Sequence, residues 1–346
     1  MADHPARHAI MTWALRGLSV LAILAVTAWS ALALYFGDNH TGTAQSVLAA
    51  LFVLAGLAAL IGQFIGRWRH LATLTFFALF AGVLAWWFSI APSNQRDWQA
   101  DVAQLPYAEI KGDQVTVHNI RNFSYRTETD YTPAWDTRTY DLSKLDTVDL
   151  FATYWMGPDI AHVMVSFGFA GQDYLTASIE ARKERGEGYS SLRGFFRQYE
   201  LTYIVADERD IVRLRTNYRK NPIEEVHLFR LKGEPELVRQ FFLGYMKSIN
   251  AVRQKPRFYN TLTSNCTNLI WAHARMNPRR IPFSWKILLS GHAPSYLYDQ
   301  GRIDTSLPFD TLMKSSLINA IAQAAGDAPD FSQRIRTVLH PAVKTP

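Results

Sequence analysis

The sequence is almost without cysteine. Cys266 is the only one in 346 residues, so no intramolecular disulfide can form. The sequence also lacks an HExxH motif and any Cys/His pairing of the kind that binds zinc. A GxSxG elbow, a P-loop and a GxGxxG motif are absent as well. Because these metal, serine-hydrolase and nucleotide signatures are missing, we expect neither a cofactor nor a metal.

Blocks of positive charge are also absent. The formal net charge is +6, but the basic residues between 182 and 280 are interspersed with acidic ones. There is no Lys/Arg block and no basic stripe spaced by aromatic residues, which argues against nucleic acid as a partner. The net positive charge is better explained by a mildly basic surface that faces anionic lipid.

Three long stretches contain no charged residue: 17–37, 45–66 and 71–91. Each matches the ~20 apolar residues that cross a bilayer as a helix. The first ends in the bulky Leu34-Tyr35-Phe36 rather than in a small-residue cleavage site, which argues against a signal peptide. Buried helices of a soluble core are the alternative, and runs this long without charge argue against it. We expect three transmembrane helices.

The short flanks of these stretches predict their orientation. Arg7 and Arg16 precede the first, and Arg67-Trp68-Arg69-His70 joins the second to the third, whereas 38–43 has no Lys or Arg. The positive-inside rule then places the N-terminus in the cytoplasm and everything after residue 92 in the periplasm. The expected localisation is therefore the inner membrane, as a multi-pass protein.

The chain is expected to divide into a transmembrane region (1–92), a polar linker (93–106) and a periplasmic domain (107–346). Residue propensities and helix-start signals predict the elements of that domain. The expected strands are 114–120, 147–155, 161–169, 174–181, 201–206, 211–215 and 225–231, and the expected helices are 192–199, 235–253, 265–276 and 309–325. Consecutive strands with short connections favour an antiparallel sheet with packed helices, an α+β fold.

The stretch 161–181 predicts a hairpin with a defined register. A short loop around Gly171 pairs residues whose numbers add to 342, which puts apolar side chains on one face and mostly polar ones on the other. In this register His162 and Glu180 are cross-strand neighbours, with Cβ atoms ~5 Å apart. They are either a solvated pair on a sheet face or two parts of a catalytic site.

Cys266 follows the polar turn Thr263-Ser264-Asn265 and opens a helical stretch. A helix N-terminus favours negative charge, so a thiol placed there is biased toward thiolate. The alternative is a small buried apolar side chain. With His162 to exchange the thiol proton and Glu180 to fix the imidazole tautomer, a cysteine-based catalytic site is expected. His273 is a poorer base because it lies ~10.5 Å farther along the same helix.

Two further features have structural explanations beside functional ones. The run Asp207-Glu208-Arg209-Asp210 is either a site or, more simply, a charged turn between two strands. The apolar segments 195–196 and 283–289 either line a lipid groove, touch a bilayer or pack in the core.

The order of the candidate residues, His then acid then a Cys that opens a helix, resembles the circularly permuted papain-like hydrolases and acyltransferases. More closely, 119–304 resembles the bacterial Lnb-type periplasmic domain, named for a lipoprotein N-acyltransferase. The segments that carry the resemblance are 161–162, 178–182, 203–210, 215–218 and 259–267. It implies a permuted papain-like domain after the three helices, and Asn265, Asn260 and Ser178 are candidate supporting residues. In the namesake, the periplasmic domain precedes the membrane helices.

These features together predict a membrane-anchored periplasmic thiol acyltransferase or hydrolase. Cys266 would take an acyl chain from a phospholipid as a thioester and pass it to an amine, such as a lipoprotein N-terminus. Two alternatives stay open: a cell-wall amidase or peptidase that uses the same Cys266–His162 pair with water, and a membrane-anchored binding domain without catalysis. The expected partners are phospholipid, lipoprotein and the bilayer, and no oligomeric state follows from the sequence.

Overall fold

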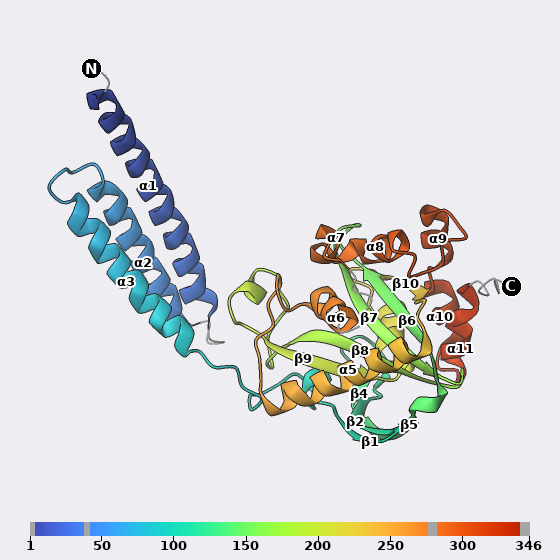
Figure 1. Cartoon of the computed structure of the whole chain (residues 1–346). Helices are drawn as coiled ribbons and strands as arrows, with labels where there is room; N and C mark the ends of the chain where they lie inside the picture. Colours follow the sequence, from blue (N-terminus) through green and yellow to red (C-terminus); the bar gives the residue numbers. More distant parts are fainter. Residues whose placement is uncertain (1–3, 38–41, 276–281, 340–346) are drawn as a thin grey trace. The chain divides into compact units, whose positions relative to one another are not determined.

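The computed structural model describes residues 4–37, 42–275 and 282–339, with side chains from residue 11 onward. The chain forms two compact units, which we describe separately (Figure 1). Unit 1 is Met1–Pro92 together with Ser190–Tyr199, and unit 2 is Ser93–Tyr189 together with Glu200–Pro346. Of the sequence-based expectations, the connection 38–41 and Met276 lie outside the described residues.

Unit 1 is built from three long apolar helices, α1 (His4–Phe36), α2 (Thr43–Gly62) and α3 (Arg69–Ser89). Each contains a segment long and apolar enough to cross a membrane, which confirms the three spans expected from the sequence. Phe52 of α2 and Phe76 of α3 are buried against each other, with ring centroids 5.5 Å apart. Many leucines point outward instead, as expected for helices surrounded by lipid.

One close approach holds α1 against α2. A Cβ added at Gly56 would lie 2.2 Å from the Thr27 hydroxyl oxygen, so only glycine fits there. Small residues at such positions let two membrane helices pack backbone to backbone. In the same unit, the helix expected over 192–199 is only a 3₁₀ turn (Arg193–Phe195), and that prediction is wrong. Arg197 has φ +56°, a left-handed conformation that a continuing right-handed helix does not allow.

Unit 2 is an α+β domain. Its main sheet contains β1 (Tyr107–Lys111), β2 (Gln114–Arg121), β5 (Trp135–Asp141), β6 (Leu145–Tyr154), β7 (Ala161–Phe169), β8 (Asp173–Arg182), β9 (Glu200–Ala206) and β10 (Glu225–Arg230). A small second sheet pairs β3 (Ser124–Tyr125) with β4 (Tyr131–Thr132). The helices are α4 (Glu208–Arg213), α5 (Pro235–Gln254), α6 (Cys266–Arg275), α7 (Trp285–Leu288), α8 (Ala293–Asp299), α9 (Phe309–Ser315), α10 (Asn319–Ala325) and α11 (Phe331–Ile335).

The strand order in the main sheet is β1-β2-β9-β8-β7-β6-β10, and β5 also pairs with β2. All of these pairs are antiparallel except β2 with β9, which meet in parallel at Arg121 and Ala206. The predicted antiparallel sheet with packed helices is therefore confirmed, with one parallel contact. The residues expected to form a linker, 93–106, belong to unit 2, where Trp98 is buried beneath Arg182.

The register of the β7–β8 hairpin is the predicted one. Met164 pairs with Ser178, and the pairing continues to Phe169 and Asp173 around a loop in which Gly171 has φ +66°. The backbone pairing stops at Met164 and Ser178, so His162 lies beyond the last hydrogen-bonded pair. The backbone pairing of the hairpin therefore ends where the candidate catalytic residues begin, and side-chain contacts take its place.

Helices cover both faces of this sheet. Phe167 of β7 packs against Phe242 and Tyr245 of α5, with ring centroids 5.0 and 5.6 Å apart. Met164 points to the opposite face, because residues three apart on a strand alternate, and it shares a core with α4, α10 and α11. α5 lies across the sheet, and its buried residues recur at helical spacing (Figure 1). The face expected to be mostly polar is thus buried as well.

Two predictions for unit 2 are wrong for a reason visible in the hydrogen bonds. The expected strand 211–215 is instead the end of α4 and a π-helical turn, Leu214–Tyr218. Asp207 begins α4 by accepting the N–H of Arg209, so the charged run is a helix start and not a turn between strands. The helix expected over 309–325 is broken between Ser316 and Ile318, because the backbone there bonds to β10.

Charged side chains tie the C-terminal part of unit 2 to the sheet. Arg336 donates to Asp149 of β6 at 2.8 Å and to both carboxylate oxygens of Glu208 at 2.7 and 2.8 Å. Both carboxylates are completely buried. Buried carboxylates need partners, since an unpaired charge in the interior is strongly unfavourable.

We therefore expect Arg336→Met to destabilise unit 2 by about 3–5 kcal/mol, the usual cost of leaving a buried charge unpaired. Arg334→Met is the matched control, because Arg334 pairs with Asp330 on the surface, with both side chains about half exposed. The control should cost less than about 1 kcal/mol. Urea unfolding of the detergent-solubilised chain, followed by near-ultraviolet circular dichroism, measures both changes. Equal effects of the two substitutions would contradict the buried ion pairs.

Candidate active site

Asparagine side chains shape the turn that presents Cys266. The Asn260 side-chain oxygen accepts the N–H groups of Leu262 and Thr263, each at 3.0 Å. Asn265 then caps the helix, since its side-chain oxygen accepts the N–H of Asn268 at 2.9 Å. Cys266 is consequently the first residue of α6, at the end of the helix that favours a negative charge.

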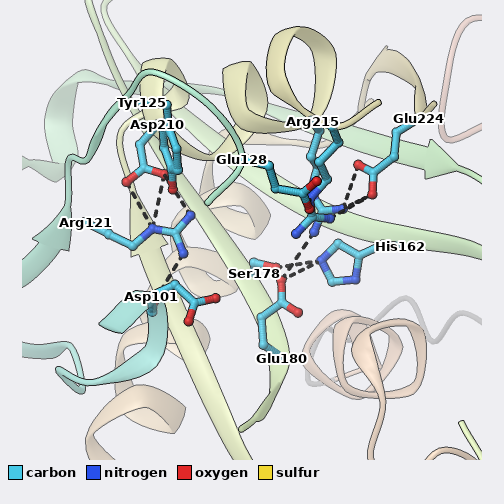
Figure 2. Close-up of polar contacts among 11 residues, drawn as sticks. Asp101, Arg121, Tyr125, Glu128, His162, Ser178, Glu180, Asp210, Arg215 and Glu224 are labelled. Carbon is cyan, nitrogen blue, oxygen red and sulfur yellow. Dashed lines mark hydrogen bonds and ion pairs between the residues drawn. The ribbon is translucent and has the colours of Figure 1, made fainter. Parts of the chain in front are cut away.

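His162 is held by a carboxylate and a hydroxyl on the neighbouring strand. Its Nε2 lies 3.0 Å from Glu180 Oε1 and 2.7 Å from Ser178 Oγ. Ser178 in turn donates its proton to Glu180 at 2.7 Å, so the Ser178 oxygen accepts from Nε2–H. Figure 2 shows Glu180 and Ser178 on the same edge of the imidazole ring. The contact expected from the hairpin register is therefore present.

The thiol of Cys266 lies against the same imidazole. The two side chains lie close enough to shift each other's pKa, and the backbone N–H of Val163 also lowers the pKa of the thiol. The sulphur also lies 3.7 Å from the hydroxyl oxygen of Thr267. Because Nε2 is occupied by Glu180 and Ser178, Nδ1 is the ring nitrogen left for the thiol. The helix α6 contacts β7 and β8, which brings together residues about 100 positions apart in the chain. This nucleophile–base–carboxylate order is the arrangement that thiol catalysis requires.

The surroundings favour the charged form of each of these groups. Burial opposes an imidazolium, but the attraction of Glu180 outweighs it and raises the pKa of His162 to about 9. Burial likewise opposes a thiolate, but the hydrogen bond and charge of His162 hold the pKa of Cys266 below its usual value. Burial opposes the Glu180 carboxylate, and His162 and Arg215 hold its pKa well below the usual range. Between the thiol pKa and about pH 9, the thiolate and imidazolium coexist.

Arg215 extends the site behind Glu180 and had no assigned role in the sequence-based site. It is buried in the π-helical turn after α4, with Nη2 3.5 Å from Glu180 and Nη1 3.1 Å from Glu224 (Figure 2). Arg219 also pairs with Glu224, at 2.7 Å. The chain of alternating charges thus runs from the imidazole to the surface. Only the family resemblance of 215–218 pointed to this segment.

The second charged cluster in Figure 2, around Asp210, stabilises the fold. Asp210 is fully buried and accepts from Arg121 at 2.7 Å, from Tyr125 at 3.1 Å and from the Phe123 N–H at 2.8 Å. These bonds join β2 and the β3 segment to α4. The charged run 207–210, which was a possible site from the sequence, therefore has a structural role through Asp210.

The remaining candidate histidine, His273, does not join the site. Its Nε2 contacts the hydroxyl of Tyr203 at 3.0 Å, and burial lowers its pKa to about 4. It instead lines an apolar cavity of about 140 Å³ between β6, α5 and α6. Ile270, one of its lining residues, lies one helical turn along α6 from Cys266, which is not itself part of the lining. Within the described part of the chain, no cluster of His, Cys, Asp or Glu could hold a metal ion.

Comparison with known proteins finds a family match that spans this site. Residues 131–291 match the family model described as the Lnb N-terminal periplasmic domain. This segment is therefore similar to that domain, and it contains all the candidate residues: His162, Ser178, Glu180, Asn260, Asn265 and Cys266. No curated protein and no solved structure matches the chain. Together with the three apolar helices, the match describes a membrane protein with a periplasmic domain.

The ion pair predicts how fast Cys266 is alkylated at different pH values. Iodoacetamide reacts with the thiolate, so the wild-type rate should already be high near neutral pH and gain little above about 9, where His162 loses its proton. In His162→Ala, the rate should follow an ordinary thiol with a pKa near 8.5, of which only about 1% is thiolate at pH 6.5, so the rate there should be far below that of the wild type. Quenching the reaction at set times and measuring the alkylated fraction by mass spectrometry gives both profiles.

Two variants control this experiment. Cys266→Ser should not be alkylated, because the chain has no other cysteine. His273→Gln keeps a polar partner for Tyr203 and does not touch the thiol, so its profile should match the wild type. Identical profiles for the wild type and His162→Ala would show that the imidazole does not act on the thiol.

Proposed function

We propose that this protein is a membrane-anchored periplasmic acyltransferase that moves an acyl chain from a phospholipid to an amine, with Cys266 as the nucleophile. The observation that carries the proposal is the contact between the Cys266 thiol at a helix start and a histidine whose far edge is held by Glu180. Ser178 supports the histidine, and Asn260 and Asn265 support the cysteine.

In the first step, the Cys266 thiolate attacks the carbonyl carbon of an acyl ester. The backbone N–H of Cys266 is the natural donor to the oxyanion, since among the described residues it has no hydrogen-bond acceptor. The C–O bond then breaks, and imidazolium His162 gives its proton to the departing alcohol. The products are a thioester on Cys266 and a lysophospholipid.

In the second step, an amine attacks the thioester. Neutral His162 takes the amine proton, the C–S bond breaks, and the thiolate–imidazolium pair forms again. An N-terminal lipoprotein amine is the acceptor that the resemblance to the lipoprotein N-acyltransferase family suggests. Three apolar helices support a lipid donor, because anchoring the chain in a bilayer raises the effective concentration of a lipid substrate. The order His, acid, Cys supports a permuted papain-like arrangement of the domain.

The proposal includes a topology, with the N-terminus in the cytoplasm and residues after 92 in the periplasm of an inner-membrane protein. The basic flanks Arg16 and Arg67-Trp68-Arg69 support it. A reporter that is active only in the periplasm, fused after Pro346, should therefore be active, and a cytoplasm-only reporter at the same place should be silent. The reverse pattern would contradict the three-helix orientation.

A second candidate is a cell-wall amidase or peptidase, which would use the same thiol and imidazole with water as the acceptor. The site geometry suits both reactions, because amides and esters pass through similar oxyanions. The apolar cavity one turn from Cys266 favours a substrate with a hydrocarbon part. A binding domain without catalysis is disfavoured by the thiol–imidazole contact.

Incubation of the purified chain with phospholipid vesicles should give a mass increase of one acyl chain on Cys266, which hydroxylamine removes. Cys266→Ser should give no adduct and no transfer. His162→Ala should lower transfer by about 10²–10⁴-fold, the usual contribution of a general acid–base. Glu180→Gln should have a smaller effect, because Glu180 orients the histidine and does not touch the reacting atoms.

Intact mass spectrometry and transfer of a labelled acyl chain to a lipopeptide amine measure these effects. The double variant Cys266→Ser, His162→Ala should lose little more transfer activity than the more damaging of the two single variants. The effects of residues that act as a unit are not additive. Release of peptides from peptidoglycan without any need for lipid would favour the amidase instead. A Cys266→Ala chain with full activity would falsify both enzymatic proposals.

A further inference from the structure

Large apolar side chains are exposed on two segments of unit 2 that lie far apart in the sequence. The first segment is α7 with its flanking residues, and its exposed apolar side chains are Phe283, Trp285, Leu288 and Leu289. The second is the loop between β6 and β7, which exposes Met156 and Ile160. The exposed fraction is 56% for Trp285 and 67% for Met156. We call these six residues the apolar rim. Exposed apolar residues on neighbouring segments usually mark a binding surface.

Several bonds join the two segments into one surface. The Gly291 N–H donates to the Asp159 carbonyl at 3.0 Å, and the hydroxyl of Ser290 accepts the N–H of Ala161 at 3.0 Å. A Cβ on Gly291 would lie 2.0 Å from the Pro158 carbonyl oxygen, so the two backbones touch. The ring of Trp285 packs on His292, with centroids 5.0 Å apart. The rim is therefore held in a fixed arrangement.

The apolar rim borders both halves of the candidate active site. Phe283 packs on Trp271 of α6, the helix that begins at Cys266, with ring centroids 5.6 Å apart. On the other side, Ile160 lies two residues before His162 in the chain. The helix α7 contacts α6, and the turn after α7 contacts β7. Whatever covers the rim is thus brought beside the thiol and the imidazole.

The chemistry of the rim matches a bilayer interface. It combines Trp and Phe with aliphatic residues, which is the composition that enters the boundary between head groups and acyl chains. The charged neighbours of the rim have polar partners: Lys286 pairs with Asp299 at 2.6 Å, and Asp159 contacts His292 at 2.8 Å. Only residues 90–92 separate α3 from unit 2, and this connection can span at most ~10 Å.

We propose that the apolar rim inserts into the lipid head-group boundary of the bilayer that anchors the chain. In this arrangement, a phospholipid acyl ester passes from the membrane to Cys266 without crossing water. The membrane contact stands on the rim alone, whereas the delivery of substrate rests on the proposed acyl transfer. A protein partner that covers the rim is the competing occupant, and the experiment below separates the two.

The direct test places a fluorescent label on the rim of the full-length chain. In a Cys266→Ser background, Leu288→Cys and Ile110→Cys are each labelled with bimane and reconstituted in phosphatidylethanolamine–phosphatidylglycerol vesicles. The native side chains are matched in exposure, 40% for Leu288 and 39% for Ile110, and Ile110 lies on β1, away from the rim. A lipid with a nitroxide near its head group should quench the label at 288 about twofold and leave the label at 110 unchanged. Equal quenching at both positions, or none at 288, would overturn the proposal.

A second measurement separates membrane contact from catalysis. The double variant Trp285→Ser, Leu288→Ser removes apolar area from the rim without touching Cys266, His162 or Glu180. Alkylation of Cys266 should be unchanged, while acyl transfer from vesicle phospholipid should fall about tenfold, as weaker interfacial binding requires. Unchanged transfer from vesicles would contradict delivery through the rim. If the wild type transfers no acyl chain at all, the quenching result still decides whether the rim meets lipid.

Discussion

The charge pair between His162 and Glu180 is the constraint on which the rest of the site depends. Burial alone would lower the pKa of the histidine, and a neutral imidazole would leave the thiol protonated. Glu180 reverses that tendency, but a buried carboxylate must itself be stabilised. Ser178 and Arg215 supply this stabilisation, and Arg215 in turn needs Glu224. The need for a charged imidazole beside the thiol therefore involves Glu180, then Arg215 and finally Glu224.

The fold meets this requirement by joining three local structures. The β7–β8 hairpin supplies the histidine and its carboxylate, the π-helical turn after α4 supplies the arginine, and the asparagine-capped start of α6 supplies the thiol. Backbone pairing in the hairpin ends at Met164 and Ser178, and the sulphur contacts the N–H of Val163 just beyond this point. The site thus occupies the place where a ladder of hydrogen bonds has stopped and backbone groups are available.

What the sequence could predict follows from how local each feature is. The contact between His162 and Glu180 follows from period-2 patterning and one glycine turn, so it was predictable. The contact between Cys266 and His162 spans about 100 residues and depends on how α6 packs on the sheet, which no spacing encodes. Arg215 was hidden because five residues, 211–215, read as a strand although Asp207 starts a helix there. Capping and buried ion pairs outweighed β-propensity at that point.

The ion pairs of Arg336 have a consequence for how the protein is made. A chain emerges during synthesis with its N-terminal end first, so Glu208 appears long before its partner at position 336, whereas Asp149 also pairs with the earlier Arg230. Until then, burying the Glu208 carboxylate would leave its charge without the arginine that balances it in the folded chain. We therefore expect the start of α4 to dock fully on the sheet only when almost the whole of unit 2 has been made.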